Sequence, residues 1–375
     1  MNVCIVTSSY PANPNDVAAP FAADFARAIQ RRGHRVVVIA PERPDAGGYS
    51  DAVPVLWIPR RQTGKPLVQT RLTSPADLWM TLKLLRNGER LLLRTVREQS
   101  IDVCFALWAL PAGYLAWRVR RRTAVPYAVW ALGSDINTFA RYPVLRSLIK
   151  RILKDARWRF ANSELLADRV RALAGADCQF LPATRSLPAS TQGLDLTGRI
   201  RFLFVGRLER VKGVDVLVEA MARLRSEPGV HLYVVGGGSL QAQIARQIAS
   251  AGLQDRITMV PPAPTALVAA YLGACHCLVI PSRSESLPVV VPEAIQAGTP
   301  VLVTDTGDMG RLAREYGLMS PVPPGDPVAL ADAMHAFVAD PAAMRRRFED
   351  ARPRLLDLFD LDAGADRILA AFAGS

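Results

Sequence analysis

Short apolar segments alternate with helix-like segments twice along this chain. The first alternation starts with VCIVTSS (3–9), a helical stretch from Pro20 to Arg32, and RVVVIAP (35–41). The second starts with RFLFVGR (201–207), and HLYVVGGG (231–238) follows after a helix. Strands that are apolar throughout are typical of parallel sheets covered by helices on both faces. The sequence therefore predicts an α/β fold with two doubly wound halves.

A segment rich in Pro, Ser, Thr and Gly separates the two halves, from Pro182 to Gly198. Such a composition is typical of a linker, and 375 residues suffice for two domains at about 100–200 residues each. We predict an N-terminal domain at 1–185, a linker at 186–199, a C-terminal domain at 200–355 and a C-terminal helix at 356–375. Ligands of doubly wound folds bind where parallel strands end, so we expect the functional site in a cleft across which the two domains face each other.

Positive charge is concentrated in the first half of the chain. Residues 1–195 hold 28 Lys and Arg against 15 Asp and Glu, a net charge of +13, while the whole chain carries +12. This asymmetry favours an anionic partner: nucleic acid, an acidic membrane surface or a phosphorylated substrate. A solvated basic face without function is the alternative. We expect no nucleic acid, because the sequence contains no binding motif or interleaved aromatic pattern.

Residues 77–97, DLWMTLKLLRNGERLLLRTVR, form a basic amphipathic stretch. Such a helix can pack on a core or lie on a membrane, and Asn87-Gly88 favours a break into two helices. No apolar run approaches the ~20 residues that cross a bilayer, and the first residues lack the basic region and cleavage site of a signal peptide. Five cysteines, mostly in apolar runs, indicate reduced thiols. We expect a cytoplasmic protein with peripheral contact at the inner face of the cytoplasmic membrane.

Three segments carry residues suited to binding a nucleotide sugar. FVGRLERVKGVD (204–215) places Gly206, Arg207 and Lys212 between a strand and a helix, where cations suit a diphosphate and stabilise the charge that grows on it as a leaving group. VVGGGS (234–239) ends a strand with Gly236 and Gly237. These glycines indicate either close backbone approach to a nucleotide or a plain tight turn, and the pattern lacks the features of a dinucleotide-redox site.

The third segment is PSRSESLPVVVPEAIQAGTPVLVTD (281–305), in which Glu285 precedes Glu293 by eight positions. Glu285 lies in a loop, and Glu293 lies in the first turns of the next helix. We expect Glu293 to accept ribose hydroxyls and Glu285 to face the sugar. Two carboxylates would also suit hydrolysis. Solvated acids that flank a helix are a weaker interpretation, because both lie among apolar residues.

We expect no metal site. If Cys275, His276 and Cys277 lie on a strand, alternation of side chains places His276 on the opposite face from the two thiols. The one Asp-any-Asp pattern, Asp360-Leu361-Asp362, lies near the C-terminal helix and away from the segments expected to bind phosphate.

In its motifs, the chain resembles the retaining GT-B glycosyltransferases of family 4, the glycosyl transferases group 1 type. The glutamate pair with its flanking Pro-Ser and Ala-Gly-Thr-Pro-Val carries the resemblance, as does FVGRLERVKGVD. VTSSYP, GHRVVVIAP, ALPAG (109–113), GSDIN (133–137) and PPGDP (323–327) follow the order of the family. The resemblance implies two Rossmann-like domains of the GT-B fold, with the last helix crossing back to the first domain. It also implies a retaining, metal-independent transferase whose leaving phosphate oxygen takes the proton of the acceptor.

The resemblance also implies roles for single residues. Arg207 and Lys212 would bind the diphosphate, Glu293 the ribose, and Glu285 would lie beside the donor sugar. Backbone groups near Ser286, Leu287 and Val289 would hold sugar and phosphate, but Pro288 has no amide hydrogen to offer. Asp135 and Asn137, from the other domain, could contact sugar or acceptor, and an interior role fits them equally well.

The chain departs from the family pattern at four places. Leu132 stands where the family commonly has a His that positions the donor sugar. Ala18-Ala19 replace a glycine of the early loop, so backbone approach to the diphosphate at Ala19 is restricted. Ala183-Thr184-Arg185-Ser186 replace the usual Asn-Gly-Val-Asp, and Ser286 replaces the Gly that often follows the first glutamate.

Together these features predict a hexosyltransferase-type enzyme that uses a UDP- or GDP-sugar as co-substrate and no further cofactor. We expect an anionic or lipid-linked acceptor, such as a polyprenyl-diphosphate-linked saccharide in the synthesis of a surface polysaccharide. A catalytically impaired nucleotide-sugar-binding or assembly protein is the alternative. A GT-B-like epimerase would need acid and base groups in the cleft, and the four histidines, at 34, 231, 276 and 335, show no pairing there.

Overall fold

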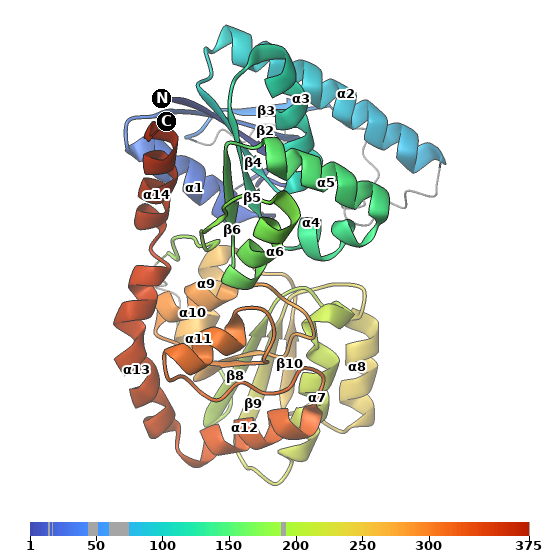
Figure 1. Cartoon of the computed structure of the whole chain (residues 1–375). Helices are drawn as coiled ribbons and strands as arrows, with labels where there is room; N and C mark the ends of the chain where they lie inside the picture. The colour runs from blue at the N-terminus through green and yellow to red at the C-terminus, as the bar shows by residue number, and fades with distance from the viewer. Residues whose placement is uncertain (14–15, 17, 44–51, 60–74, 189–192, 375) are drawn as a thin grey trace. The chain divides into compact units, whose positions relative to one another are not determined.

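The computed structural model describes residues 1–13, 16, 18–43, 52–59, 75–188 and 193–374. The chain forms two compact units. Unit 1 comprises Met1–Pro182 together with Leu361–Ser375, and unit 2 comprises Ala183–Asp360. Each unit has one parallel sheet with helices on both faces, which confirms the predicted doubly wound α/β architecture (Figure 1).

The sheet of unit 1 has seven parallel strands in the order β3-β2-β1-β4-β5-β6-β7. Cys4 of β1 lies opposite Val37 of β2 on one side and opposite Cys104 of β4 on the other. The chain therefore progresses outward from β1 in one direction and then from β4 in the other. The strands are β1 Asn2–Thr7, β2 Arg35–Pro41, β3 Val55–Ile58, β4 Val103–Leu107, β5 Tyr127–Ala131, β6 Trp158–Ala161 and β7 Gln179–Phe180.

Helices cover both faces of this sheet. Helices α2, α3, α5 and α6 contribute apolar side chains to the core on one face, and α1 and α14 lie on the other (Figure 1). The helices are α1 Pro20–Arg31, α2 Pro75–Glu98, α3 Tyr114–Thr123, α4 Ser134–Asn137, α5 Pro143–Asp155, α6 Glu164–Ala174 and α14 Leu361–Ala373. Local signals set some ends: Ser163 accepts a hydrogen bond from the Leu166 amide at the start of α6, and Gly175 ends it in the left-handed conformation.

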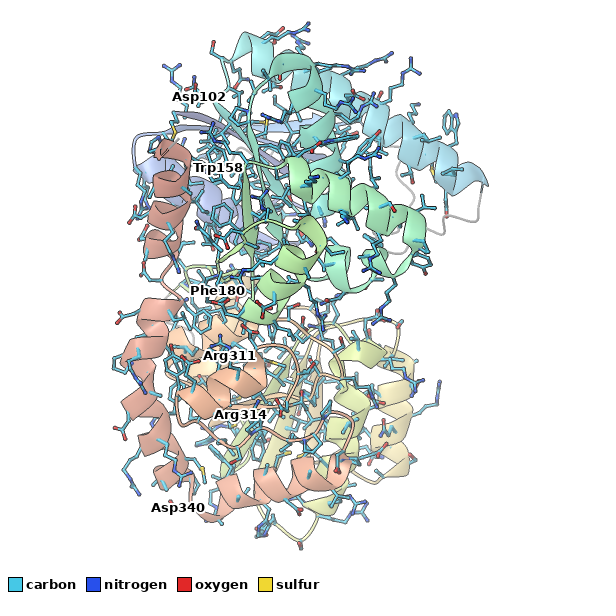
Figure 2. All side chains as sticks on the ribbon, in the orientation of Figure 1. Asp102, Trp158, Phe180, Arg311, Arg314 and Asp340 are labelled. Carbon is cyan, nitrogen blue, oxygen red and sulfur yellow. The ribbon has the colours of Figure 1, made fainter. Side chains whose placement is uncertain are left out.

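Helix α14 belongs to unit 1 although unit 2 separates it in sequence from the rest of that unit. Its buried residues recur at helical spacing on one face: Leu361, Gly364, Ala365, Ile368, Leu369 and Phe372. The Phe372 ring lies 5.9 Å from that of Phe105 on β4 and 4.9 Å from that of Trp158 on β6, and Trp158 is labelled in Figure 2. Apolar packing thus holds the last helix on the first sheet.

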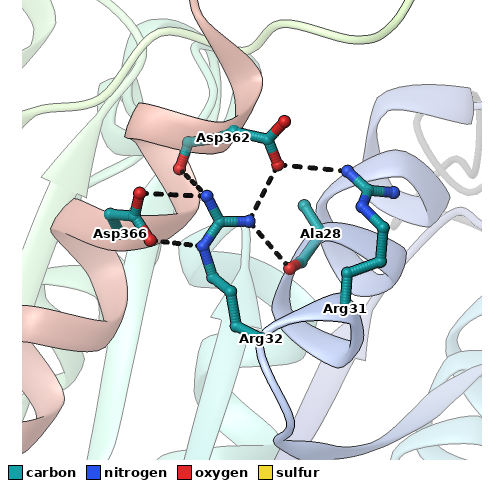
Figure 3. A network of polar contacts seen from close by, with 5 residues as sticks. All are labelled: Ala28, Arg31, Arg32, Asp362 and Asp366. Atoms are coloured by element: carbon teal, nitrogen blue, oxygen red, sulfur yellow. Dashed lines mark hydrogen bonds and ion pairs between the residues drawn. The ribbon is translucent and has the colours of Figure 1, made fainter.

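A polar network at the end of α1 fixes the position of α14 along that helix (Figure 3). Arg32 donates hydrogen bonds to Asp362 at 2.8 Å and to Asp366 at 2.9 Å, and Arg31 donates to Asp362 at 3.1 Å. These hydrogen bonds lower the pKa of both carboxyl groups. Because the aspartates are largely exposed, the network contributes less to stability than the apolar contacts do, and it chiefly specifies register.

The sheet of unit 2 has five parallel strands in the order β10-β9-β8-β11-β12. The strands are β8 Ile200–Val205, β9 Val230–Val235, β10 Ile257–Val260, β11 Cys277–Ile280 and β12 Val301–Val303. Helices α7, α8 and α12 pack on one face, while α10 contacts both α9 and α13 on the other. The helices are α7 Val214–Arg223, α8 Gln241–Ser250, α9 Thr265–Ala274, α10 Val290–Ala297, α11 Met309–Glu315, α12 Pro327–Ala339 and α13 Pro341–Leu358.

The predicted break at Asn87-Gly88 is wrong, because α2 runs without interruption from Pro75 to Glu98. Gly88 faces the interior, where a Cβ atom would lie 2.9 Å from Leu115 and 3.0 Å from Ile58. The glycine therefore permits close packing of α2 and does not end it. None of the helices in the described part of the chain combines the length and the hydropathy needed to span a membrane.

The boundaries of the units differ slightly from the predicted ranges. Residues 183–188 belong to unit 2, because the side chain of Gln296 hydrogen bonds to the backbone of Arg185 and of Leu187. Residues 189–192 of the expected linker lie outside the described residues. The expected C-terminal helix at 356–375 corresponds to the end of α13 at Leu358 and a separate helix, α14.

Candidate active site

The strand order of unit 2 creates a topological switch point between β8 and β11. From β8 the chain proceeds to β9 and β10 on one side, and it then crosses to β11 and β12 on the other. The loops that leave β8 and β11 therefore diverge at the carboxyl edge of the sheet, which is where ligands of such folds bind. Arg207 and Lys212 follow β8, and Glu285 follows β11.

Lys212 and Glu285 meet at this switch point although they are far apart in sequence. The Lys212 ammonium group donates a hydrogen bond to Glu285 Oε2. Both side chains are about one-fifth exposed, at 19% and 20%. Arg207 is exposed on the same loop as Lys212, and it has no ion pair with another residue in the described ranges. The fold thus places a cation and a carboxylate in contact at this edge, with a second cation, Arg207, exposed on the loop after β8.

Glu293 lies in the first turn of α10 and is almost completely buried. Arg185 Nη1 lies 3.4 Å from Glu293 Oε1. A buried carboxylate at a helix N-terminus, next to a guanidinium group, has its charge compensated from two sides.

The loops at the carboxyl edge are packed backbone to backbone. Gly213 has φ +68°, and a Cβ atom there would lie 1.9 Å from the carbonyl oxygen of Pro281, in the loop after β11. Gly236 has φ +145°, and its Cβ would lie 1.9 Å from the carbonyl oxygen of Gly206. Only glycine fits either position. Gly236 is therefore required by the contact between two turns, whether or not a nucleotide is present.

Polar contacts add to this packing. The Leu208 amide donates to the Gly237 carbonyl at 2.9 Å, which joins the turns after β8 and β9. Ser239 Oγ donates to Glu209 at 2.6 Å across the same two turns, and this hydrogen bond is the main reason why the pKa of Glu209 is lowered.

A bidentate ion pair joins the loop after β11 to α7. Arg283 donates to the two carboxylate oxygens of Asp215 at 2.6 Å and 2.8 Å. Burial is the largest single influence on the pKa of Asp215 and would raise it, but the hydrogen bonds and charge of Arg283 and two backbone amides together lower the pKa overall. The pair holds the loop that carries Glu285 against the helix that follows Lys212.

The residues expected to offer backbone groups lie next to Glu285. Ser286 and Leu287 are buried, and the Ser286 carbonyl accepts a hydrogen bond from the Asp308 amide at 3.0 Å. Val289 is half-buried and immediately precedes α10.

Asp135 of unit 1 lies in the interior and not at a surface. It is fully buried, and its carboxylate accepts hydrogen bonds from the amides of Ala109 at 2.8 Å and of Gly133 and Ile136 at 3.1 Å. Burial raises the pKa of Asp135, and the amide donors oppose this rise. Since its oxygens hold the loop after β5 to the loop after β4, we assign Asp135 a structural role in place of the expected contact with sugar or acceptor.

The other two positions predicted on unit 1 are also near strand ends. Asn137, the last residue of α4, accepts a hydrogen bond from Arg169 of α6. Ala19 precedes α1 with φ 50° and ψ 49°, which is the left-handed conformation that glycine adopts more easily. The alanine thus keeps the glycine-like backbone of the early loop, at a cost of roughly 1–2 kcal/mol.

Within the described residues, no group of three or more His, Cys, Asp and Glu side chains is arranged to hold a metal ion. His276 Nδ1 accepts a hydrogen bond from the Arg201 amide at 3.0 Å. Asp362 is engaged by Arg31 and Arg32.

Comparison with known proteins identifies the family. The glycosyl transferases group 1 family model matches residues 191–354, and the glycosyl transferase 4-like domain model matches residues 18–182. TuaC of Bacillus subtilis, a glycosyltransferase named for teichuronic acid biosynthesis, is 27% identical over 364 residues, which cover 90% of this chain and 89% of TuaC.

Solved structures show the same fold. A sucrose-phosphate synthase from Thermosynechococcus elongatus has a TM-score of 0.79 at 21% identity, with complete coverage of both chains. HepE of Anabaena in complex with UDP-glucose has a TM-score of 0.75 at 15% identity, covering 99% of this chain and 100% of HepE. The architecture is thus that of a GT-B glycosyltransferase. The chain belongs to the family 4-type, group 1 glycosyltransferases.

Several residues of this site have no counterpart in the sequence-based predictions. Arg185 beside Glu293, Arg283 on Asp215, and Glu209 on Ser239 all join segments that are distant along the chain. Periodicity cannot reveal such contacts. One signal was present for Arg185, because it stands in the four-residue departure from the family pattern at 183–186.

The close contact at Gly213 can be tested against a matched glycine. Gly213→Ala should destabilise the protein by about 1–3 kcal/mol more than Gly252→Ala. Both glycines have positive φ, but only Gly213 lies against backbone, whereas nothing approaches Gly252 within 4 Å. Urea unfolding followed by circular dichroism measures the difference. Tryptophan fluorescence would miss it in unit 2, since all six tryptophans lie in unit 1. Equal destabilisation by the two substitutions would contradict the packing argument.

Proposed function

We propose that this glycosyltransferase moves a sugar from a nucleoside-diphosphate sugar, with UDP or GDP as the nucleotide, to an acceptor hydroxyl. The observation that carries the proposal is the contact between Lys212 and Glu285 at the switch point of unit 2, with Arg207 exposed on the same loop as Lys212. Cations at the end of a parallel strand, before a helix N-terminus, suit a diphosphate. HepE, which has the same fold, binds UDP-glucose.

The proposed roles follow from position and chemistry. Arg207 and Lys212 bind the diphosphate, and Glu285, in contact with Lys212, lies beside the donor sugar. Glu293 accepts hydrogen bonds from the ribose hydroxyls. Gly206, Gly236 and Gly237 form the turns against which the nucleotide lies, and backbone groups of Ser286, Leu287 and Val289 complete the donor site.

In the proposed reaction, the bond between the anomeric carbon and the diphosphate oxygen breaks, and a bond from that carbon to the acceptor oxygen forms on the same face. The proton of the acceptor hydroxyl passes to the departing phosphate oxygen, so the anomeric configuration is retained. Negative charge grows on the diphosphate as the bond breaks. Arg207 and Lys212 stabilise that charge more in the transition state than in the ground state, and we assign no role to a metal or a further cofactor.

For the acceptor we propose an anionic or lipid-linked saccharide at the inner face of the cytoplasmic membrane. Support comes from the outer side of unit 1. Trp79 and Leu82 of α2 are 58% and 57% exposed, and Val144 of α5 is 81% exposed. The N-terminal ends of α2 and α5 point toward the same side of unit 1 (Figure 1).

Exposed cations accompany these apolar side chains. Lys83, Arg86 and Arg90 follow on α2, and Lys83 lies 5.2 Å from the centre of the Trp79 ring. An aromatic and aliphatic cluster flanked by Lys and Arg is the composition that binds an anionic bilayer surface. TuaC, which aligns with 90% of this chain, is named for the biosynthesis of teichuronic acid.

The donor proposal predicts that one class of nucleotide sugar, among UDP-, GDP- and ADP-sugars, raises the melting temperature of the protein saturably in the absence of metal. Slow hydrolysis of that donor should follow.

Combined Arg207→Ala and Lys212→Ala substitutions should reduce turnover by about 100-fold or more, since the charge on the leaving group is no longer stabilised. Arg345→Ala, which removes an exposed cation of α13, is the control. Binding without turnover, even with candidate acceptors, would favour a nucleotide-sugar-binding or assembly protein. No response to any nucleotide sugar would refute the donor proposal.

Substitutions of the two glutamates should change different kinetic parameters. Glu293→Ala removes the ribose acceptor and should raise the KM for the donor, by about 10-fold or more for lost charge-assisted hydrogen bonds. Glu285→Ala should chiefly lower kcat, because it disturbs the sugar and the position of Lys212. Steady-state kinetics with varied donor concentration separates the two effects. Unchanged kinetics in both variants would remove these residues from the site.

The membrane proposal predicts that the protein sediments with vesicles of equal parts phosphatidylglycerol and phosphatidylcholine, and that added salt weakens this binding. Combined Trp79→Ser and Leu82→Ser substitutions should weaken it by about 10-fold or more, because less apolar surface is buried. Val328→Ser, at an exposed apolar residue of unit 2, is the matched control. Equal binding by both variants would place the contact elsewhere.

A further inference from the structure

The segment that opens unit 2 lies along helix α10. Gln296 Nε2 donates to the Arg185 carbonyl at 2.7 Å, and the Leu187 amide donates to Gln296 Oε1 at 2.8 Å. One side-chain amide therefore hydrogen bonds to the backbone on both sides of Ser186. Gln296 lies three residues after Glu293, on the same side of α10. The segment is thus fixed to the helix that presents Glu293.

The Arg185 side chain lies between the Glu293 carboxylate and the Thr265 hydroxyl. Its Nη1 lies 3.4 Å from Glu293 Oε1, and its Nη2 donates to Thr265 Oγ1 at 2.6 Å, at the start of α9. The Arg185 and Glu293 side chains are only 11% and 9% exposed. The guanidinium group is therefore held by an ion pair and a hydrogen bond, and it is not a mobile surface cation.

A carboxylate this deeply buried is costly without an opposite charge nearby. The ionised form accepts hydrogen bonds at both oxygens, whereas a protonated carboxyl group loses part of that capacity. A ribose that presents two hydroxyl donors needs the ionised form. Arg185 supplies that opposite charge, with Nη1 at 3.4 Å from Glu293 Oε1.

We propose that Arg185 is a positioning residue of the donor site, which keeps Glu293 ionised and oriented toward the ribose hydroxyls. The inference rests on the proposed function of Glu293 and extends it to a residue outside the glutamate motif. Arg185 acts on the recognition of ribose through Glu293, so it governs donor affinity and the preference for ribose over deoxyribose. The diphosphate and the sugar are held by other residues.

Isothermal titration with UDP, GDP and their 2′-deoxy forms tests this role in wild type, Arg185→Met, Glu293→Gln and the double variant. Arg185→Met should weaken binding of the preferred ribonucleotide by about 10-fold and bring its affinity close to that of the deoxy form. The double variant should bind no more weakly than Glu293→Gln alone, because Arg185 acts through that carboxylate. Arg185→Lys keeps the charge and should restore part of the affinity, and Arg345→Met controls for loss of a cation.

The outcomes separate this inference from the proposed function. If Glu293→Gln weakens binding while Arg185→Met leaves both the affinity and the ribose preference unchanged, Arg185 has no positioning role and the ribose contact stands. Additive losses in the double variant would likewise overturn the inference. If Glu293→Gln changes neither quantity, the ribose contact itself is wrong. Should Arg185→Met unfold, Arg185→Gln decides, because it removes the charge and keeps a hydrogen-bond donor for Thr265. A folded Arg185→Gln protein with unaltered ribose preference and affinity would overturn the inference.

Discussion

Backbone contact between loops at the carboxyl edge of the second sheet is the constraint on which the rest of unit 2 depends. Gly213 lies against Pro281, and Gly236 lies against Gly206. These contacts leave no space for a side chain, so the turns after β8, β9 and β11 form one compact layer. The backbone contacts therefore also fix the positions of the polar residues on these turns. Lys212 and Glu285 meet because the backbones that carry them are already in contact.

Opposite charges in and around this layer are paired before any substrate arrives. Lys212 contacts Glu285, Arg283 holds Asp215, and Arg185 accompanies Glu293. Partly buried charges are stable only with such partners, so Lys212, Glu285 and Glu293 each have a neighbour of opposite charge that also orients them. A site built in this way needs little rearrangement to receive a charged ligand, which is the property that favours transition-state stabilisation.

The sequence was sufficient to predict much of this protein, for physical reasons that particular elements make clear. Short apolar runs such as those at 35–41 and 231–235 are typical of strands of a sheet covered on both faces, so the doubly wound architecture followed from them. The group 1 glycosyltransferase motifs, among them the glutamate pair 285 and 293, were recognisable because their spacing is local.

Contacts between distant segments were not predictable in the same way. Gly88 was taken to interrupt a helix, although its lack of a side chain serves packing against Leu115. Asp135 was considered for contact with sugar because its type suits that role, whereas burial and three backbone donors give it a structural one. Arg185 was noted as a departure from a motif, but its partner on α10 lies more than a hundred positions away.

The order in which the ribosome delivers the chain differs from the order in which the units can be completed. Unit 2 is finished once Asp360 has been synthesised, while unit 1, begun first, still lacks α14. Domains generally fold as units during synthesis, so the later unit can close its core earlier. Until the final segment emerges, the face of the first sheet around Phe105 and Trp158 lacks the cover that Phe372 provides. A stop codon just after Asp360 would therefore damage the unit encoded at the opposite end of the gene.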